Sequence, residues 1–375
     1  MWGSPDTLTS SDPVRTLLGV QKGCAIIATT LCLVLSLAAE PKAKSKEKAN
    51  ADSPPPLTLS GGRTLSYERS FSSEREVKLK RGFWNRVVDI VAGAPEFRRM
   101  NRPYSVVTDS RGRIIVTDPG LSGVHIFDFV QEKYKFLSHA EGKDALLAPQ
   151  CVAVDAQDNI YVTDSEVGKI FVWDANGKHR RTIGSLKGGE GYFKRPTGIA
   201  VDSEAQRIYV SDTLRHKIFV LDLQGNVLQT IGQRGGGEGE FNFPTELRLH
   251  GQELFVVDAM NFRVQALDRS GKFLYGVGQI GEVNGSMFRP KGIGFDSENN
   301  LYVVDGLFET VQVFNQKGQL LYYFGQSGNG PEEFQLPAGM FIDRENRIYV
   351  ADPYNHRIQV FRYSAPSQPA SGGTQ

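Results

Sequence analysis

Clustered glycines are the first feature of this sequence that could do chemistry. Residues 235–244 read GGGEGEFNFP, and such a loop can hold a phosphate on its backbone N–H groups when a strand precedes it and a helix follows. No helix is predicted after Pro244, because the following segment alternates in short apolar and β-branched runs typical of strands. The loop therefore lacks the helix that a nucleotide site requires.

Versions of this loop recur along the chain, and each ends in proline. The prolines are 46 to 48 residues apart and occupy positions 103, 149, 196, 244, 290 and 337. A phosphate-binding loop occurs once per site, whereas a structural loop recurs with its repeat. The glycines are therefore attributed to six sequence repeats.

Each repeat contains apolar runs that predict four short strands, and the second run ends in aspartate. The aspartates are Asp118, Asp164, Asp212, Asp258, Asp305 and Asp352. Four antiparallel strands per repeat are typical of a propeller blade. We expect each carboxylate to accept N–H groups of a turn. Large apolar residues three positions before each proline are expected to plug the space between blades: Met100, Leu146, Phe193, Phe241, Met287 and Phe334.

The last repeat carries a family resemblance. The stretch DPYNHRIQVF at residues 352–361 resembles the NHL repeat. The stretch GGGEGEFNFP at residues 235–244 resembles the glycine loop of that repeat. The resemblance covers about residues 86–362 and implies an all-β, six-bladed β-propeller of the exported bacterial type. The sixth repeat lacks its fourth strand, so we predict that an N-terminal strand, residues 86–92, pairs with residues 357–362 and closes the ring.

The N-terminal region is predicted to direct export. Residues 23–39 are uncharged and mostly apolar and follow Lys22, which is typical of a secretory signal cleaved before Ala39. An uncleaved inner-membrane anchor is the alternative. We expect a periplasmic or extracellular protein that touches a membrane only through residues 23–39, if they are retained. The predicted segments are a signal or anchor (1–39), a flexible linker (40–83), the propeller (84–363) and a disordered tail (364–375).

The charge balance argues against a nucleic-acid partner. The chain has a net charge of +1, and beyond residue 83 it holds 31 Lys and Arg against 34 Asp and Glu. A nucleic-acid surface needs a basic excess. Some intracellular NHL proteins bind RNA or act with ubiquitin ligases, but no Cys/His spacing of a RING domain is present here.

Metal and nucleophile chemistry find little support in the sequence. His216 and His356 occupy equivalent positions, but they belong to opposite repeats, three and six. Amidating lyases are similar propellers with a histidine-bound zinc, and the third equivalent histidine is absent. We expect no cofactor; zinc or calcium would accompany the enzyme alternative. Cys151 is expected to be a packed free thiol.

The fourth repeat departs from the pattern. Glu246 and Arg248 occupy inner-strand positions that are small or apolar elsewhere, and His250 replaces the usual aspartate. Two residues apart on a strand, Glu246 and Arg248 face the same side, so they form either an ion pair in the wall or a polar site in the central channel. Local pairing with aspartates is the alternative for Arg263 and Arg357. The candidate ligand-binding residues are Glu246, Arg248, Lys291, Arg215, Arg263 and Arg357.

One face of the propeller is predicted to carry the function. In a four-stranded meander the turn after the second strand and the glycine loop share a face, and loop variation there would decide binding. We predict a binding or scaffold module for a protein, peptide or small ligand on this face. An enzyme with a channel site, of the amidating-lyase or gluconolactonase-like type, is the alternative. The predicted surface for a protein or peptide partner comprises Tyr104, Leu214, Met260, Phe308 and Tyr354.

Overall fold

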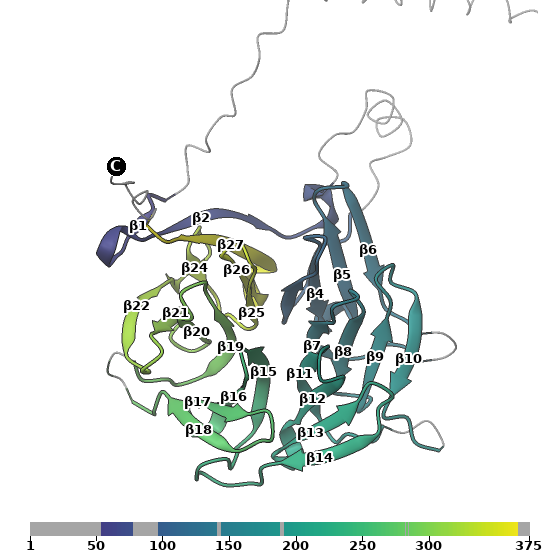
Figure 1. The fold of residues 1–375 in the computed structure, drawn as a ribbon. Coiled ribbons are helices and arrows are strands. Elements are labelled where there is room, and N and C mark those ends of the chain that lie inside the picture. Colours follow the sequence, from purple (N-terminus) through teal and green to yellow (C-terminus); the bar gives the residue numbers. More distant parts are fainter. Residues whose placement is uncertain are drawn as a thin grey trace, which may run out of the picture. The chain divides into compact units, whose positions relative to one another are not determined.

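Six antiparallel sheets, one for each repeat, surround a central channel in the computed structural model and form a six-bladed β-propeller (Figure 1). The structure describes residues 54–77, 97–140, 144–187, 191–281, 283 and 285–366. All of these belong to one compact unit. The signal or anchor prediction for residues 1–39 lies outside them.

Blades 1 to 5 are each built from four consecutive strands, and the innermost strands contact one another around the channel. Blade 1 contains β3 (Val106–Thr108), β4 (Ile114–Asp118), β5 (Gly123–Asp128) and β6 (Lys133–Leu137). Blade 2 contains β7 (Pro149–Val154), β8 (Ile160–Asp164), β9 (Lys169–Trp173) and β10 (His179–Ile183). Blade 3 contains β11 (Pro196–Asp202), β12 (Arg207–Asp212), β13 (Lys217–Asp222) and β14 (Val227–Ile231).

The second half of the ring follows the same plan until the last blade. Blade 4 contains β15 (Pro244–His250), β16 (Glu253–Asp258), β17 (Arg263–Asp268) and β18 (Phe273–Val277). Blade 5 contains β19 (Pro290–Phe295), β20 (Leu301–Asp305), β21 (Thr310–Phe314) and β22 (Leu320–Phe324). Blade 6 contains β25 (Met340–Ile342), β26 (Arg347–Asp352), β27 (Arg357–Ser364), β2 (Thr64–Phe71) and β1 (Leu57–Thr58).

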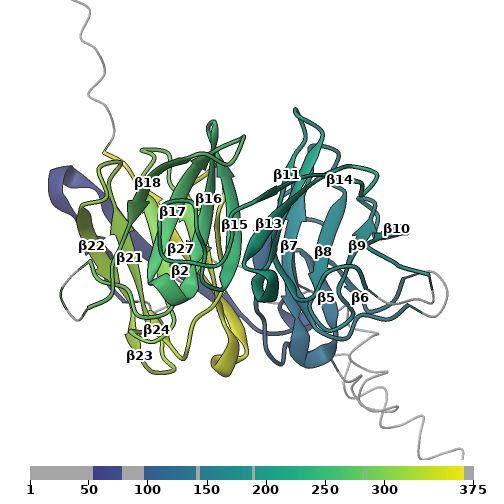
Figure 2. The same cartoon turned by 90° about the horizontal axis from the view of Figure 1, so that it is seen from below.

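The short elements lie in the connections between strands. A parallel pair of two-residue strands, β23 (Gln326–Ser327) and β24 (Glu333–Phe334), shapes the loop before blade 6. The single-turn 3-10 helices are η1 (Ser60–Gly62), η2 (Glu74–Glu76), η3 (Pro119–Leu121), η4 (Thr213–Arg215), η5 (Ala259–Asn261) and η6 (Pro353–Asn355). Viewed from the side, turns and loops occupy the two ends of the blades (Figure 2). None of the helices in the described part of the chain is long and apolar enough to cross a membrane.

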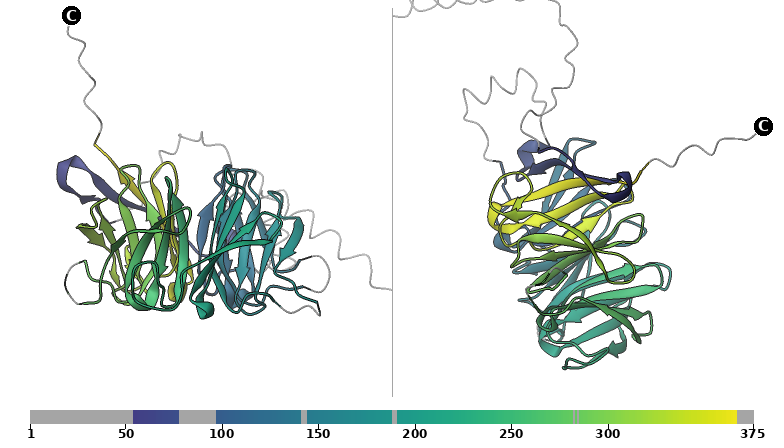
Figure 3. Two further views of the ribbon diagram at one scale, coloured as in Figure 1. Left: turned by 60° about the horizontal axis from the view of Figure 1, so that its bottom comes forward. Right: turned by 90° about the vertical axis from the view of Figure 1, so that its left-hand side faces the viewer.

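The last blade takes its outer strands from the N-terminal side of the chain, but not from the predicted residues. Strand β2 pairs antiparallel with β27 from Thr64 opposite Ser364 to Phe71 opposite Ile358. The purple strand lies along the yellow one in Figure 1 and in Figure 3. The other edge of β27 pairs with β26. Because a strand has two edges, the predicted pairing of residues 86–92 with 357–362 is wrong; residues 86–92 lie outside the described residues.

The predicted linker at 40–83 and the propeller start at residue 84 need the same correction. Residues 57–71 include β1 and β2 and belong to the sheet of blade 6. Leu65 and Phe71 are 2 % exposed and join two hydrophobic clusters of the core. The Lys, Ser and Pro content of residues 40–83 is typical of a linker, but the run TLSYERSF at residues 64–71 forms a strand.

The predicted plugs between blades are confirmed. All six large apolar residues before the loop prolines are buried, with exposed fractions between 0 % and 4 %: Met100, Leu146, Phe193, Phe241, Met287 and Phe334. Each adds about 2 to 3 kcal/mol of apolar burial. Each belongs to a different hydrophobic cluster of the core and anchors its glycine loop there.

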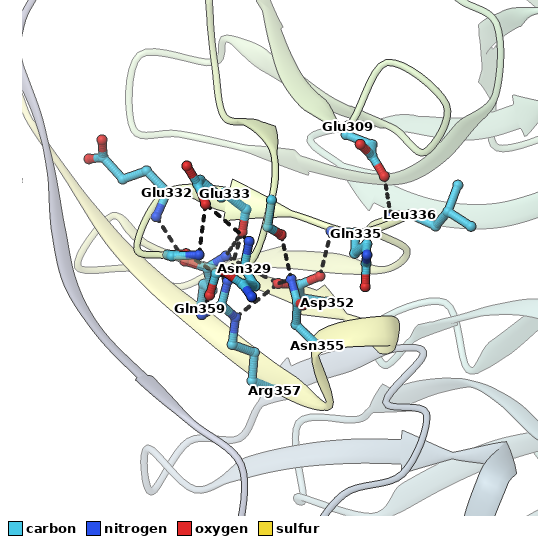
Figure 4. Close-up of polar contacts among 12 residues, drawn as sticks. Glu309, Asn329, Glu332, Glu333, Gln335, Leu336, Asp352, Asn355, Arg357 and Gln359 are labelled. Atoms are coloured by element: carbon cyan, nitrogen blue, oxygen red, sulfur yellow. Dashed lines mark hydrogen bonds and ion pairs between the residues drawn. The ribbon is translucent and has the colours of Figure 1, made fainter.

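The aspartates accept N–H groups, as predicted. In blade 6, Asp352 accepts the backbone N–H of Gln335 at 2.9 Å and the Asn355 amide at 2.9 Å (Figure 4). The Arg357 guanidinium donates to Asp352 and to the carbonyls of Asn329, Gly330 and Glu333. The buried carboxylate therefore fastens the glycine loop to the blade, and this arrangement is called the loop latch below.

Candidate functional site

The innermost strands pack so closely that three blades have no side chain at one level of the channel wall. A Cβ atom on Gly198 would lie 2.0 Å from the Thr245 carbonyl oxygen, and one on Gly339 would lie 2.5 Å from that of Tyr104. Gly292 is equally confined by the next strand. Only glycine fits such positions. Side chains of the remaining blades can consequently reach across the channel at this level.

Glu246 of β15 and Cys151 of β7 meet in this way across the intervening Gly198. The Cys151 thiol donates to Glu246 Oε2 at 3.1 Å, and Arg248 Nη2 donates to Glu246 Oε1 at 3.2 Å. Burial raises the pKa of Glu246, while the Arg248 charge opposes that change. Burial, followed by the Glu246 charge, raises the pKa of Cys151 well above its usual value. The predicted Glu246–Arg248 ion pair is present, and the packed thiol is confirmed by its 2 % exposure.

Arg248 also spans the channel. Its Nη2 donates to the Met340 carbonyl of blade 6 at 2.9 Å, and its guanidinium carbon lies 5.2 Å from the Phe341 ring centroid. Its Nε has no partner among the described residues. Arg248 and Phe341 also line a cavity of about 200 Å³ whose other walls are apolar, such as Ala153 and Leu247, except for Thr108. Arg248 thus lies between the polar contacts of Glu246 and the largely apolar cavity beside Leu247.

The channel mouth on the glycine-loop face is cationic. Lys291 Nζ lies 5.8 Å from the centre of the Tyr104 ring, and no carboxylate of the described residues pairs with this ammonium group. Burial, together with the charges of Arg289 and Arg195, lowers the pKa of Lys291 to about 8. The same two arginines act on the phenol of Tyr104, whose pKa burial raises. Lys291 therefore lies over the Tyr104 ring, and the charges of Glu246, Arg289 and Arg195 all act on its phenol.

The structure positions these cations through the aspartates. Asp212 Oδ1 accepts the backbone N–H of Arg195 at 3.0 Å, and Asp305 Oδ1 accepts that of Arg289 at 3.1 Å. The Lys291 side chain passes beside Gly306, the residue after Asp305. A Cβ atom at position 306 would lie 3.4 Å from Lys291 Cγ, so glycine leaves room for the lysine.

Sequence reasoning missed Arg195 and Arg289. A signal was available, since arginine precedes the loop proline in alternate repeats, at Arg102, Arg195 and Arg289.

Three predicted ligand-binding residues are engaged in local contacts. Arg263 donates to Asp258 at 3.0 Å and to the carbonyls of the neighbouring glycine loop, and Arg357 does the same in the loop latch. Arg215 donates to the Tyr192 carbonyl at 2.9 Å and lies over two aromatic rings. The structure brings Glu246, Arg248 and Lys291 to the channel and leaves these three arginines at the turns between the second and third strands of their blades.

The residues of the predicted partner surface differ in exposure. Met260 and Tyr354 are each 51 % exposed and Phe308 is 38 % exposed. Leu214 is half-buried, and Tyr104 lies in the channel mouth. An additional exposed ring, Phe288, lies 6.3 Å from the Phe308 ring and 5.9 Å from the Phe262 ring. On this face Met260, Phe288 and Phe308 are therefore exposed on blades 4 and 5, and Tyr354 is exposed on blade 6.

The two equivalent histidines contact backbone groups. His216 Nδ1 accepts the Phe243 N–H at 3.2 Å, and His356 Nδ1 contacts the Asn101 carbonyl. Within residues 54–366, leaving aside the gaps in the described ranges, no three His, Cys, Asp or Glu side chains converge as metal ligands would.

Comparison with known proteins bears on the architecture. No curated protein matches the sequence. Similar solved structures include virginiamycin B lyase from Staphylococcus aureus, with 13% identity over 80% of this chain and 99% of that chain and a TM-score of 0.52. An auxiliary nutrient binding protein from Bacteroides thetaiotaomicron shares 12% identity over 71% of this chain and 70% of that chain, with a TM-score of 0.55. Kuenenia stuttgartiensis hydrazine synthase shares 13% identity over 70% of this chain and 96% of that chain, with a TM-score of 0.51.

At these identities the likeness shows the fold alone, and the finer NHL-repeat assignment stays a prediction. A family model described as 6-bladed beta-propeller matches residues 143–231, 203–277 and 293–371. These matches cover five of the six blades in whole or in part and more than half of the chain. The chain therefore belongs to the 6-bladed beta-propeller family.

Proposed function

We propose that this protein binds a small ligand through an anionic group, a carboxylate or a phosphate, at the channel mouth on the glycine-loop face. The observation that carries the proposal is the unpaired Lys291 ammonium beside Arg195 and Arg289. A partly buried cation without a counter-ion is costly. An anion that accepts hydrogen bonds from these groups would remove that cost.

The surrounding groups suit recognition of an anion. Glu246 does not neutralise Lys291, because its carboxylate is already bound by Arg248 and by the Cys151 thiol. Arg195 and Arg289 carry planar guanidinium groups, and each group can bind two oxygens of a carboxylate or phosphate. Tyr104 adds a hydroxyl and an aromatic wall. A ligand with one anionic end and an apolar body would fit both the mouth and the exposed rings of Phe288 and Phe308 beside it.

Binding is favoured over catalysis by the state of the buried groups. The raised pKa of Cys151 keeps its sulfur protonated, and a thiol is a poor nucleophile. The fold does not choose between the two roles, since similar structures are named as a lyase and as a nutrient binding protein. Glu246 contacts both Cys151 and Arg248. These contacts support a structural role for the three residues below the proposed anion site.

Calorimetric titration of the full chain with inorganic phosphate, succinate and citrate tests the proposal. We expect at least one of these anions to bind, and Lys291→Met to weaken its affinity about tenfold or more. Lys178→Met is the matched control, because Lys178 is an exposed lysine on a turn away from the channel. Wild-type affinity in Lys291→Met, or an equal loss in Lys178→Met, would exclude the channel mouth as the site.

We also propose that this binding takes place outside the cytoplasm, on the basis of the apolar segment 23–39. The test is cell fractionation followed by mass spectrometry of the N-terminus, with a mature end near Ala39 expected. A full-length product in the cytoplasm would contradict export.

A further inference from the structure

Blade 4 departs from the other blades at the end opposite the glycine loops. Its first two strands are joined by a tight turn in which His250 pairs with Glu253 and Gly251 adopts a φ of 54°. In blades 2 and 5 an aspartate holds a longer turn: Asp155 accepts the N–H groups of Gln157 and Asn159, for example. His250 has no carboxylate and cannot hold a turn in this way.

Neighbouring turns at this end are fastened to each other elsewhere in the ring. Ser110 of blade 1 donates its N–H and hydroxyl to Asp158 of blade 2, at 3.0 and 2.8 Å. Ser297 of blade 5 exchanges two hydrogen bonds with Asn346 of blade 6, each 2.9 Å long. Between blades 4 and 5 the described turn residues instead make a single side-chain hydrogen bond, between His250 Nε2 and Asn299 Oδ1 at 2.8 Å.

A cavity of about 440 Å³ lies between blades 4 and 5 at this end. Its aromatic part comprises Phe255, Phe295 and Tyr275, and the His250 ring stacks on Phe295 with 4.1 Å between centroids and 9° between planes. The Phe255 and Phe295 centroids are 4.5 Å apart. Tyr275 is 36 % exposed and fixed by a 2.9 Å hydrogen bond from its hydroxyl to Glu253. The volume is in the range of small-molecule sites.

The polar groups around this cavity are neutral or acidic. Among the described residues that line it, the polar side chains are four amides, one imidazole, one phenol and one carboxylate, and none is Lys or Arg. Asn299 uses its Oδ1 for His250, so its Nδ2 is left as a donor without a partner in the described residues. Gln252 is exposed and also has no side-chain partner there. These groups can donate to and accept from hydroxyls, but they offer nothing to neutralise an anion.

We propose that the cavity between blades 4 and 5 binds a neutral carbohydrate, with one sugar ring against Tyr275 and Phe295 and its hydroxyls bonded to Asn299, Gln252 and Glu253. A sugar ring has apolar C–H faces and a polar hydroxyl edge, which match an aromatic wall beside amides. This site is independent of the proposed anion site, because it is built from the turns at the opposite end of the blades.

Calorimetric titration of the full chain with glucose, galactose, maltose and cellobiose tests the proposal. We expect at least one sugar to bind, and Tyr275→Ala and Asn299→Ala each to weaken its affinity about tenfold or more. Tyr323→Ala is the matched control: this tyrosine is 54 % exposed on the outer strand of blade 5 and does not line the cavity. Tyr323→Ala should bind with wild-type affinity.

Two further outcomes keep this proposal separate from the anion site. Lys291→Met should leave sugar binding unchanged, and Tyr275→Ala should leave phosphate, succinate and citrate binding unchanged. Absence of binding by all four sugars, or wild-type sugar affinity in both Tyr275→Ala and Asn299→Ala, would overturn the carbohydrate site. Sugar binding lost in Lys291→Met but kept in Tyr275→Ala would place the sugar in the channel and overturn it as well.

Discussion

Arg357 in blade 6 and Lys291 in blade 5 carry cationic groups on the same face of the propeller, in different surroundings. Arg357 donates to the Asp352 carboxylate and to three loop carbonyls, so its charge and its donors are used within the fold. Lys291 has no carboxylate partner among the described residues and lies beside two further cations.

This difference separates structural charges from charges available to a ligand. A buried ion pair with complete hydrogen bonds is costly to break from one side, whereas an unpaired cation destabilises the protein that carries it. Mutations in the loop latch should therefore reduce stability and leave anion binding intact. Mutations at the mouth should do the reverse.

Removing the strand that completes blade 6 should have the largest effect. A chain that begins at residue 73 lacks β2, so β27 loses its eight-residue antiparallel partner and the core loses Leu65 and Phe71. Burial of these two side chains alone contributes about 4 to 6 kcal/mol, close to the whole stability of many domains. We expect this chain to be insoluble or to unfold without cooperativity, measured by circular dichroism. A chain that begins at residue 53 is the control, and equal melting temperatures would contradict the assignment of β2.

Breaking the loop latch should have the next largest effect. Asp352→Ala leaves the Gln335 N–H and the Arg357 Nε–H without their acceptor and removes the charge that pairs with Arg357, and we expect a loss of about 3 kcal/mol in the free energy of unfolding. Asp352→Asn keeps an acceptor oxygen and should lose less. Chemical denaturation measures both. If Asp352→Ala weakened anion binding without loss of stability, the latch would belong to the binding site.

The free energy of unfolding of the protein should depend on pH in a direction set by Lys291. Its pKa is about 8 in the folded protein and about 10.4 in the unfolded chain, so the unfolded state binds more protons between these values. Stability contributed by this site therefore rises with pH across that window. Lys291→Met should be more stable than the wild type by about 3 kcal/mol below pH 8, and this advantage should vanish towards pH 10.5. Urea denaturation at a series of pH values measures the difference; an advantage that grows with pH would contradict the unpaired state of Lys291.

The exposed rings beside the mouth should contribute least to stability. Phe308→Asp is expected to change the free energy of unfolding by about 0.5 kcal/mol or less, because Phe308 is a turn residue with 38 % exposure. A photo-crosslinking residue at position 308 should yield a specific protein or peptide adduct in cells. The same residue in place of Leu274, which is 42 % exposed on the outer strand of blade 4, is the control. Identical adducts from both positions would argue against a partner surface on this face.

Much of the fold could be predicted because it repeats. The prolines, the aspartates and the buried residues before each loop mark every blade at nearly constant spacing. The closing strand could not be placed in the same way, because β2 occurs once and carries neither the proline nor the aspartate. Two segments before the repeats, residues 64–71 and 86–92, could each supply the closing strand. Only the pairing with β27 identifies residues 64–71 as that strand.

The candidate site was predicted in part. Glu246 and Arg248 could be found because they break a small or apolar pattern, and their pairing follows from their spacing on one strand. The cations at the mouth come from blades 3 and 5, more than 90 residues apart between Arg195 and Arg289. No local pattern joins such residues, and the arginine before each of three loop prolines gains meaning only when the ring brings the loops together.

The sequence by itself determined the number of blades, the plugs and the aspartate contacts with the glycine loops, because each depends on residues close together in the chain and repeated six times. The tertiary structure decided which charged side chains are paired within the fold and which are available to a ligand. Arg263 and Arg357 reach loop carbonyls and a buried carboxylate, while Lys291 reaches a channel mouth without an acid. It also decided where Cys151 and Glu246 meet, since their contact requires the intervening Gly198 to leave the channel open. Those outcomes depend on distances between blades, and closure of the ring sets those distances.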